Sequence, residues 1–319
     1  MRVAITGPTG AIGSELVELE LAVGNDVIAI VRPGSKNLGN LPHSGRLSII
    51  EADISDYASL KGRGKCDLFI HLAWAETFGA ERDNAEIQID NIKYSADAVR
   101  LAADWGAEAF VGTGSQAEYG PCDMKLSSRT PVNPESGYGI AKYAAGRMCR
   151  LLCGSLGIRF CWARVISVFG DRDADHTLIM YLIKSLMAGK TPELTGCDQI
   201  WDYIYAKDCA VALKAIGEKG KDGKTYCIGS GKPRRLRDYA EAVRDIAAPG
   251  AELKFGAKPY YPHQPMMLAG DITELTEDTG FVPQYSFEEG IMNVLAYVRA
   301  HSPDSGVEHE ENLSDGPHL

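Results

Sequence analysis

Short apolar runs rich in β-branched residues alternate with helical patterns over the first 165 residues. Strands are predicted at residues 3–6, 27–31, 47–51, 67–73, 109–112 and 159–165. Apolar residues at helical spacing, such as Ile12, Leu16 and Leu19, predict a first helix that ends at Gly24-Asn25. Further helices are expected around 86–105 and 138–156. Such an alternation forms a parallel sheet with helices on both faces, so we predict a doubly wound α/β fold with six parallel strands.

The pattern becomes irregular after residue 165. A helical stretch is expected near 176–188, and short strands near 201–205 and 225–228. We interpret residues 166–301 mainly as a smaller lobe, with some segments that return to pack on the sheet. Residues 302–319 contain Pro, Gly, Ser and acidic residues but almost nothing apolar, so we expect a disordered acidic tail.

Composition argues against two classes of partner. The chain has 33 Lys and Arg against 43 Asp and Glu, a net charge of −10, which does not suit binding to nucleic acid or to an anionic membrane. The start of the chain lacks the pattern of a secretory signal, and no apolar run reaches the length of a membrane span, so we expect a cytoplasmic protein. The eight cysteines lack the paired spacing of a zinc or redox site, so we expect reduced, mostly buried thiols and no metal.

A glycine-rich loop lies between the first predicted strand and the first predicted helix, with the sequence Gly7-Pro8-Thr9-Gly10-Ala11-Ile12-Gly13. Glycines let the backbone approach a ligand, and the N-terminal end of a helix can hold a pyrophosphate. The spacing is G-x-x-G-x-x-G, which differs from the ordinary dinucleotide fingerprint, so the triplet alone is weak evidence. Its position at a strand end and helix start favours a dinucleotide site over a structural turn. Residues 1–165 are therefore interpreted as a dinucleotide-binding domain.

The residues after the second strand favour NADP over NAD. An NAD site usually has an acidic residue there to bind a ribose hydroxyl. This chain instead has Arg32 and Lys36, which suit a 2′-phosphate, unless both side chains are simply solvated. Asp53, after the third strand, either meets the adenine edge or caps a helix.

Tyr138 and Lys142 are four residues apart and share one face of a predicted helix. A tyrosine exchanges protons at neutral pH only if its phenolate is stabilised, which a neighbouring ammonium does. Ser115 follows the fifth strand, at the edge of the sheet where ligands of such folds bind, and can donate a hydrogen bond to a substrate carbonyl. Thr113 is the nearby alternative for this hydrogen-bond donor. The order of these residues after the glycine loop indicates an active site.

Several segments together resemble one family of enzymes. They are the glycine loop, Asp53, His71-Leu72-Ala73-Trp74, residues 114–120, the Tyr138 and Lys142 pair, residues 164–170 and residues 199–204. The resemblance is to the NAD-dependent epimerase/dehydratase family, extended short-chain dehydrogenases that modify nucleotide-activated sugars. It covers roughly residues 1–300 and implies a Rossmann sheet with a smaller C-terminal substrate lobe.

The resemblance implies that Tyr138 is the general acid/base, that Lys142 lowers its pKa and binds the nicotinamide ribose, and that Ser115 polarises the substrate oxygen. His71 is expected to be a hydrogen-bonded strand-end residue and not a proton donor. A homodimer through the helices near 86–105 and 138–156 is expected by analogy. The expected cofactor contacts are Gly7, Thr9, Gly10, Ala11, Ile12, Gly13, Arg32, Lys36, Asp53, Ile54, Leu72, Ala73, Tyr138 and Lys142. The expected substrate contacts are Trp74, Gln116, Ser167 and Trp201.

The chain departs from the family pattern at the substrate. The 4,6-dehydratases carry an Asp-Glu pair where this chain has Gln116 and Ala117, which makes elimination of water by that route unlikely. Family arginines that grip the substrate diphosphate are replaced by Trp201 and by His263-Gln264, and an Asn is replaced by Ser167. Trp201 either stacks on a ring of the substrate or packs in the lobe. Phosphate contacts would have to come from other arginines, for which the candidates are Arg172, Arg234 and Arg235.

We therefore expect an NAD(P)-dependent reductase or epimerase of a nucleotide-activated sugar. A reductase of a small non-nucleotide carbonyl compound is the first alternative, because the diphosphate-binding arginines are missing. A non-catalytic sensor of pyridine nucleotides is the second, although a sensor has no need of the tyrosine and lysine pair.

Overall fold

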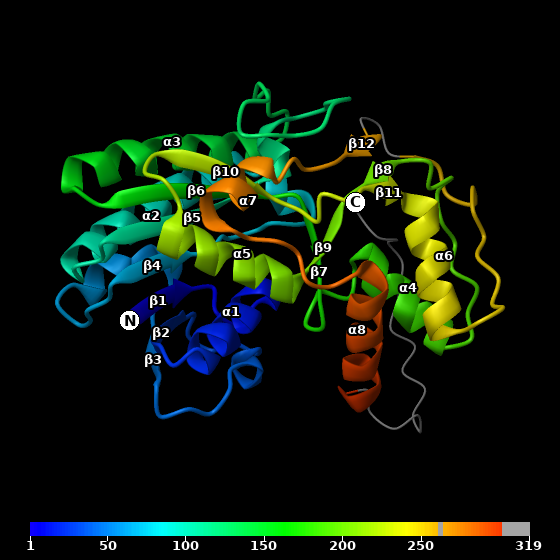
Figure 1. Ribbon diagram of the computed structural model, residues 1–319, viewed down its shortest axis with the longest axis horizontal. Helices are drawn as coiled ribbons and strands as arrows, with labels where there is room; N and C mark the ends of the chain where they lie inside the picture. The colour runs from blue at the N-terminus through cyan, green and yellow to red at the C-terminus, as the bar shows by residue number, and fades with distance from the viewer. Residues whose placement is uncertain (261–263, 302–319) are drawn as a thin grey trace.

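The protein is described here by a computed structural model that covers residues 1–260 and 264–301. The described residues form a seven-stranded parallel sheet in the order β10-β6-β5-β4-β1-β2-β3, with helices on both faces (Figure 1). This confirms the doubly wound α/β fold. The strands are β1 (Arg2–Thr6), β2 (Asp26–Val31), β3 (Leu47–Glu51), β4 (Leu68–His71), β5 (Ala109–Ser115), β6 (Arg159–Val165) and β10 (Lys224–Ile228).

The prediction of six strands was wrong by one. The run near 225–228, which we expected as a short strand after the main domain, is β10 and extends the sheet beside β6, with Tyr226 opposite Ala163. Its apolar pattern indicated a strand but not its partner. Strand β10 can pair with β6 only because the chain returns across the sheet through helix α5 (Ala206–Lys219). Local periodicity does not encode such a long-range contact.

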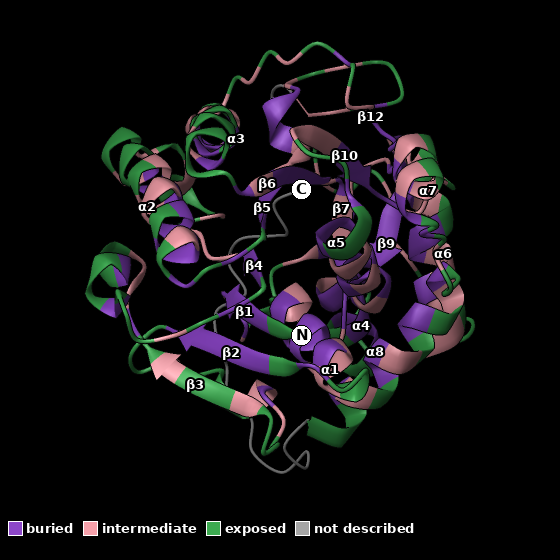
Figure 2. Cartoon of the chain, turned by 60° about the vertical axis from the view of Figure 1, so that its left-hand side comes forward, coloured by how far each residue is buried: buried purple, intermediate pink, exposed green. Residues whose placement is uncertain are grey.

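Side chains along each strand point alternately to the two faces of the sheet, and each face has its own hydrophobic core. On β1, Val3 and Ile5 face α1 (Ala11–Ala22) and α5, whereas Ala4 faces the layer of α2 (Ala85–Asp104) and α3 (Gly137–Leu156). Figure 2 shows the consequence: β1 and β2 are largely buried, and the edge strand β3 is exposed along part of its length. Four short 3-10 helices lie in the described connections: η1 (Leu38–Asn40), η2 (Ile54–Leu60), η3 (Ala80–Asp83) and η4 (Gln116–Glu118).

The smaller lobe has a third hydrophobic core, around Tyr203, Tyr239 and Phe287. Its helices α4 (Leu178–Met187), α6 (Leu236–Ala247) and α8 (Phe287–His301) lie to one side of the sheet in Figure 1. Helix α7 (Thr273–Thr279) instead packs against α5 and β10. The short strands are β7 (Ser167–Phe169), β8 (Ile200–Trp201), β9 (Tyr203–Tyr205), β11 (Arg234–Arg235) and β12 (Met267–Leu268).

The strand predicted near 201–205 is split in two at Asp202. Strand β8 pairs with β11 and β12, while β9 pairs with β7 in a different sheet. The Asp202 side chain is fully buried and accepts N–H bonds from Ser230 at 2.8 Å, Gly231 at 3.2 Å and Gly270 at 3.0 Å, as well as the Ser230 hydroxyl. One carboxylate thus joins three separate segments of the chain.

Other expectations have simpler outcomes. The eight cysteines are free, and all but Cys122 are buried. Within residues 1–260 and 264–301 there is no group of three His, Cys, Asp or Glu that could hold a metal ion, and no helix long and apolar enough to cross a membrane. The predicted disordered tail, residues 302–319, lies outside the described residues.

Replacement of Asp202 by Ala is expected to lower the free energy of unfolding by about 3 kcal/mol, because three backbone donors, of which that of Gly270 is buried, lose their acceptor. Urea denaturation followed by circular dichroism measures this. The control is Asp245→Ala, which removes an exposed carboxylate paired only with its neighbour Arg244 and should change stability by no more than about 0.5 kcal/mol. Equal stabilities of the two variants would contradict the structural role of Asp202.

Candidate active site

The glycine loop joins β1 to α1, as predicted, and its three glycines have different tasks. Gly7 has φ +66°, and a Cβ there would lie 2.9 Å from the Ala73 nitrogen, which is too close. A Cβ at Gly13 would collide with the Gly7 carbonyl oxygen. At Gly10, by contrast, the nearest atom to a Cβ is the Gly7 carbonyl oxygen at 3.8 Å. Gly7 and Gly13 are therefore needed for packing, and Gly10 leaves open space beside the backbone.

The N-terminus of α1 is open to an anion. Gly10 caps the helix without a side-chain hydrogen bond, and the first turn contains no acidic residue. The first helical hydrogen bond runs from the Ser14 nitrogen to the Gly10 oxygen at 2.9 Å, so the amides of Ala11, Ile12 and Gly13 precede the helical ladder. Free amides at the positive end of a helix, next to the space at Gly10, fit the pyrophosphate of a dinucleotide.

The loop after β2 contacts the glycine loop. The Asn40 side chain donates to the Thr9 oxygen at 2.9 Å, and the hydroxyls of Thr9 and Ser35 are 3.5 Å apart. Arg32 and Lys36 in this loop are exposed and take part in no ion pair within the described residues. Two free cations therefore lie near the expected position of the adenosine ribose.

Asp53 caps η2, since its carboxylate accepts hydrogen bonds from the nitrogen of Ser55 at 3.0 Å and from its hydroxyl at 2.7 Å. These hydrogen bonds, and to a smaller extent the charge of Arg32, hold the pKa of Asp53 below its usual value. The capping interpretation of Asp53 is thus observed. The contact of Asp53 and Ile54 with adenine stays a prediction.

His71 is a hydrogen-bonded residue at the end of β4. Its Nδ1 lies 2.8 Å from the Thr6 hydroxyl and its Nε2 lies 3.4 Å from the Ser95 hydroxyl. Burial, assisted by the charge of Lys142, lowers the pKa of His71 to about 3, so the ring is neutral at physiological pH. Both ring nitrogens are occupied, which agrees with the structural interpretation of this histidine.

Ser115, Tyr138 and Lys142 come together at the carboxyl ends of β4 and β5. Ser115 ends β5, and the other two lie in the first turns of α3. The Lys142 ammonium donates to the Thr113 oxygen at 2.9 Å and lies 3.8 Å from the centre of the Trp74 ring and 5.7 Å from that of Tyr138. The Trp74 and Tyr138 rings meet edge to face with centres 6.0 Å apart.

The Thr113 hydroxyl donates to the His71 oxygen at 3.0 Å and is therefore already used. This removes Thr113 as a rival to Ser115. The Ser115 oxygen accepts from the Ala117 nitrogen at 3.2 Å, and its own hydrogen can be donated toward the Tyr138 phenol, with which the side chain forms a hydrogen bond.

The pKa values of Tyr138 and Lys142 are both shifted from their usual values. Burial raises the pKa of the Tyr138 phenol, whereas a hydrogen bond with Ser115 and the charge of Arg82 act in the opposite direction. Burial lowers the pKa of Lys142 to about 7, against the opposing effect of Glu118. Lys142 is not among the groups that shift the Tyr138 pKa, so the expected lowering by Lys142 stays a prediction.

A buried network fixes the end of β5. The Glu118 side chain is fully buried and accepts hydrogen bonds from the Ser115 nitrogen at 2.9 Å, the Trp162 indole at 2.9 Å and the Arg164 guanidinium at 2.7 Å. Ser115 therefore has a fixed backbone position.

The expected substrate contacts occupy this same edge of the sheet. The Trp74 indole donates to Gln88 at 3.0 Å, and Gln116 begins η4. Ser167 follows β6 and accepts a hydrogen bond from the Trp201 indole at 3.0 Å. The positions at which the family has Asn and Arg are therefore filled by two side chains that bind each other.

The substitute arginines are mostly occupied elsewhere. Arg172 forms ion pairs with Glu15 and Glu18 of α1, and Arg234 forms a two-bond pair with Glu288 of α8. This corrects the expectation that either of them is available to a substrate phosphate, because each charge is already neutralised. Arg235 is exposed. His263 lies outside the described residues.

Sequence reasoning did not single out Arg82 beside the site, or Gln199 in the smaller lobe. The Arg82 guanidinium lies 4.9 Å from the centre of the Tyr138 ring, although the two residues are far apart in sequence and no motif signals the contact. Gln199 was noticed only as part of a motif. Its side chain is fully buried, and among the described residues both of its amide atoms lack a hydrogen-bond partner.

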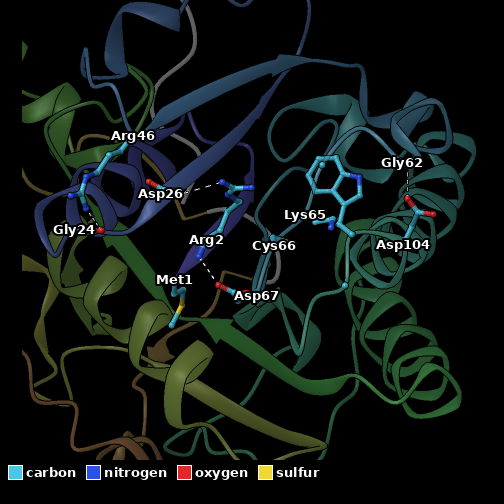
Figure 3. A pocket seen from close by; sticks show the side chains of 13 residues that line it. Met1, Arg2, Gly24, Asp26, Arg46, Gly62, Lys65, Cys66, Asp67 and Asp104 are labelled. Atoms are coloured by element: carbon cyan, nitrogen blue, oxygen red, sulfur yellow. Dashed lines mark hydrogen bonds and ion pairs between the residues drawn. The ribbon is translucent and has the colours of Figure 1, made fainter.

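A cavity of about 930 Å³ lies at the opposite edge of the sheet and is not part of this site (Figure 3). It is lined by the start of β1 and the segments after α1 and α2. Several of its polar groups are already bonded: Arg2 contacts Asp26 and Asp67, and Asp104 accepts from the Gly62 nitrogen. Parallel α/β sheets bind their ligands at the carboxyl ends of the strands, where Ser115 lies, and this cavity is at the amino ends.

Comparisons with known proteins agree with this geometry. The uncharacterized UDP-glucose epimerase YtcB of Bacillus subtilis is 27% identical over 93% of this chain and 98% of its own length. The UDP-glucose 4-epimerase of Mycolicibacterium smegmatis is 26% identical over 94% and 99%. The structure of UDP-N-acetylglucosamine 4-epimerase from Methanobrevibacter ruminantium, in complex with UDP-N-acetylmuramic acid, matches with a TM-score of 0.85 at 24% identity over 94% and 99% of the two chains.

The UDP-glucuronic acid 4-epimerase of Bacillus cereus, solved with UDP-glucuronic acid and NAD, matches with a TM-score of 0.82 at 22% identity, again over 94% and 99%. The sequence profile of the family described as "NAD dependent epimerase/dehydratase family" matches residues 3–229, which is most of the chain. Its match spans the glycine loop, Ser115, Tyr138 and Lys142. The chain therefore belongs to the NAD dependent epimerase/dehydratase family.

Proposed function

We propose that the protein is an NAD(P)-dependent enzyme that interconverts an alcohol and a carbonyl at one carbon of a nucleotide-activated sugar, as an epimerase or keto-reductase, with Tyr138 as general acid/base. The observation that carries the proposal is the meeting of Ser115, Tyr138 and Lys142 at the carboxyl edge of the sheet, beside the glycine loop. Epimerisation is the favoured form, because several relatives are named as 4-epimerases of UDP-sugars.

In this proposal a nicotinamide cofactor, when bound, would supply hydride transfer at the sugar carbon. The residues of the chain transfer the proton. The Tyr138 phenolate takes the hydroxyl proton when the carbonyl forms and gives it back when the carbonyl is reduced. The Ser115 hydroxyl, which bonds to the Tyr138 phenol when no substrate is present, would donate its hydrogen to the same substrate oxygen. Lys142 is fixed through the Thr113 oxygen, where its ammonium can bind a ribose hydroxyl.

Elimination of water is not part of the proposal. A dehydratase needs an acid and a base beside neighbouring sugar carbons, and Gln116 and Ala117 can supply neither. The next carboxylate along the chain, Glu118, is buried and bonded to Ser115, Trp162 and Arg164, so it cannot reach a substrate proton.

A second candidate is a reductase of a small carbonyl compound without a nucleotide. The hydrogen bond between Trp201 and Ser167 favours it, because no cation stands at these two positions to meet a diphosphate. A panel of carbonyl substrates with and without UDP, GDP, CDP and TDP groups separates the two candidates.

We infer a preference for NADP. The support is the pair of exposed cations, Arg32 and Lys36, beside the loop that binds Thr9. Five of the similar solved structures contain NAD, so this preference would distinguish the chain from them.

We further infer a homodimer through α2 and α3. These helices pack side by side on one face of the sheet (Figure 1) and leave apolar side chains exposed on their outer surface, namely Ile89, Met148 and Leu151. Leu151 is 71% exposed, which is costly for a leucine in a monomer and favours a partner surface of the same kind.

Tyr138→Phe is expected to reduce turnover of the active UDP-sugar at least about 100-fold, since general acid/base catalysis contributes that much, with cofactor affinity retained. Chromatographic separation of the two epimers measures the rate, and fluorescence titration measures the affinity. The matched control is Tyr143→Phe, one turn further along the same helix, which should keep its rate. Full activity of Tyr138→Phe would refute the proposed role.

Arg32→Gln is expected to weaken NADP binding about ten-fold or more while NAD binding stays the same, because only NADP has a phosphate for the guanidinium to bind. Isothermal titration with each nucleotide is the measurement. Arg63→Gln, an exposed arginine outside the site, serves as control. An unchanged ratio of the two affinities would count against NADP.

Leu151→Glu is expected to convert a dimer into a monomer, because it places a charge in an apolar contact. Sedimentation velocity determines the mass. Val282→Glu, at another exposed apolar position, should leave the mass of the wild-type dimer unchanged. A wild-type monomer at all concentrations would rule out the inferred interface.

A further inference from the structure

The loop between β4 and α2 carries an arginine to the proposed acid/base. Its turn η3 ends at Asp83, whose carboxylate accepts the Gly137 N–H at 2.6 Å. A Cβ on Gly137 would lie only 3.1 Å from the Asp83 Cα. The turn is thus held closely against the first residue of α3, directly before Tyr138.

The rest of this loop is also fixed. The Asn91 side chain exchanges two hydrogen bonds of 2.9 Å with the backbone of Ala75, and the Gln88 side chain donates to the Glu76 oxygen at 3.1 Å. Phe78 meets His176 of the smaller lobe edge to face, with ring centres 4.6 Å apart. The loop is therefore anchored to α2, to α3 and to the lobe, so Arg82 has a defined position.

The charge of Arg82 has no carboxylate partner within the described residues. The two acids beside it are engaged with other donors: Glu81 accepts from the Asn84 side chain at 2.7 Å, and Asp83 accepts from Gly137. The guanidinium lies 4.9 Å from the centre of the Tyr138 ring. An unpaired cation next to a phenol stabilises the phenolate.

We propose that Arg82 is a positioning residue of the active site, which acts through Tyr138 by holding a cation over its ring and stabilising the phenolate. The inference rests on the proposed role of Tyr138. Sequence reasoning assigned the stabilisation of the phenolate to Lys142 alone. The proposal assigns part of it to Arg82, a loop residue that lies outside every motif.

The other groups around the phenol make this contribution necessary. On its own helix, Lys142 points its ammonium at the Thr113 oxygen and the Trp74 ring. Burial is the largest effect that raises the pKa of Tyr138, and the charge of Glu118, from η4, raises it further. Ser115, at the end of β5, lowers the pKa by a hydrogen bond, and Asp83, from η3, is bonded to Gly137. Arg82 is thus the cation that opposes Glu118 and burial.

The test is the ionisation of Tyr138 in the complex with the nicotinamide cofactor. Tyrosinate absorbance is titrated in pairs of proteins with and without Tyr138→Phe, and the difference gives the midpoint of this one phenol. Arg82→Met should raise the midpoint by about one pH unit, because the cation is lost, and Arg82→Lys should restore most of the shift. Arg100→Met, at an exposed α2 residue paired with Asp97, should leave it unchanged.

An unchanged midpoint in Arg82→Met, with a thermal unfolding temperature like that of the wild type, would overturn the proposal. A wild-type phenol that does not ionise below about pH 11 would do so as well. In turnover, the acidic limb of the oxidation rate should move to higher pH by the same amount in Arg82→Met, with the rate at high pH retained.

The outcome is separable from that of the proposed function. If Tyr138→Phe keeps its turnover and Arg82→Met still shifts the midpoint, the proposed function fails and the contact between Arg82 and Tyr138 stands. If Tyr138→Phe is inactive and the midpoint does not move, the proposed function stands and the role of Arg82 is refuted.

Discussion

The buried ion pair between Glu118 and Arg164 is the constraint on which the candidate site depends. Both side chains are almost fully removed from water, and separating them would leave an unpaired buried charge at a cost of about 3–5 kcal/mol. The same carboxylate accepts the Ser115 N–H and the Trp162 indole N–H. The carboxyl ends of β5 and β6 are therefore held together by one acid, and Ser115 is placed as a consequence.

Glycines make room for this network. A Cβ at Gly112 or at Gly114 would collide with the Trp162 ring, and one at Gly146 would lie 2.7 Å from it. The indole can reach Glu118 only because the strand and the helix on either side of it lack side chains there. The arrangement also has an electrostatic cost, since burial and, to a smaller extent, the negative charge of Glu118 raise the pKa of the phenol that is proposed to lose a proton. The hydrogen bond with Ser115 and the charge of Arg82 act in the opposite direction.

Local signals in the sequence were enough to predict most of the sheet and the position of the chemistry. The glycine loop, Ser115 and Tyr138 were predicted because parallel strands and the helices that follow them leave readable patterns, and ligands bind where those strands end. The predictions failed where a contact joins distant segments. The partner of β10, the break at Asp202 and the approach of Arg82 each depend on residues more than 25 positions away. Apolar periodicity describes which side of an element is buried, but not what lies against it.

Arg172 and Arg234 in the smaller lobe already form ion pairs, so neither is available to an anionic group of a substrate. Arg172 joins the segment after β7 to α1, and Arg234 joins β11 to α8 within the lobe, so both arginines are used in ion pairs between elements of the fold. Between them, Trp201 and Ser167 satisfy each other without any charge. A diphosphate bound in this region would therefore have to be met by neutral donors or by Arg235. The amide of Gln199, buried and without a partner among the described residues, is one neutral group that lacks an internal hydrogen bond. A buried amide without a partner is unfavourable in the empty protein, and a ligand or a water molecule that bonds to it removes that penalty. The Trp201 side chain is only 4% exposed and belongs to the hydrophobic core of the lobe, which favours the packing interpretation of this residue over stacking on a substrate ring.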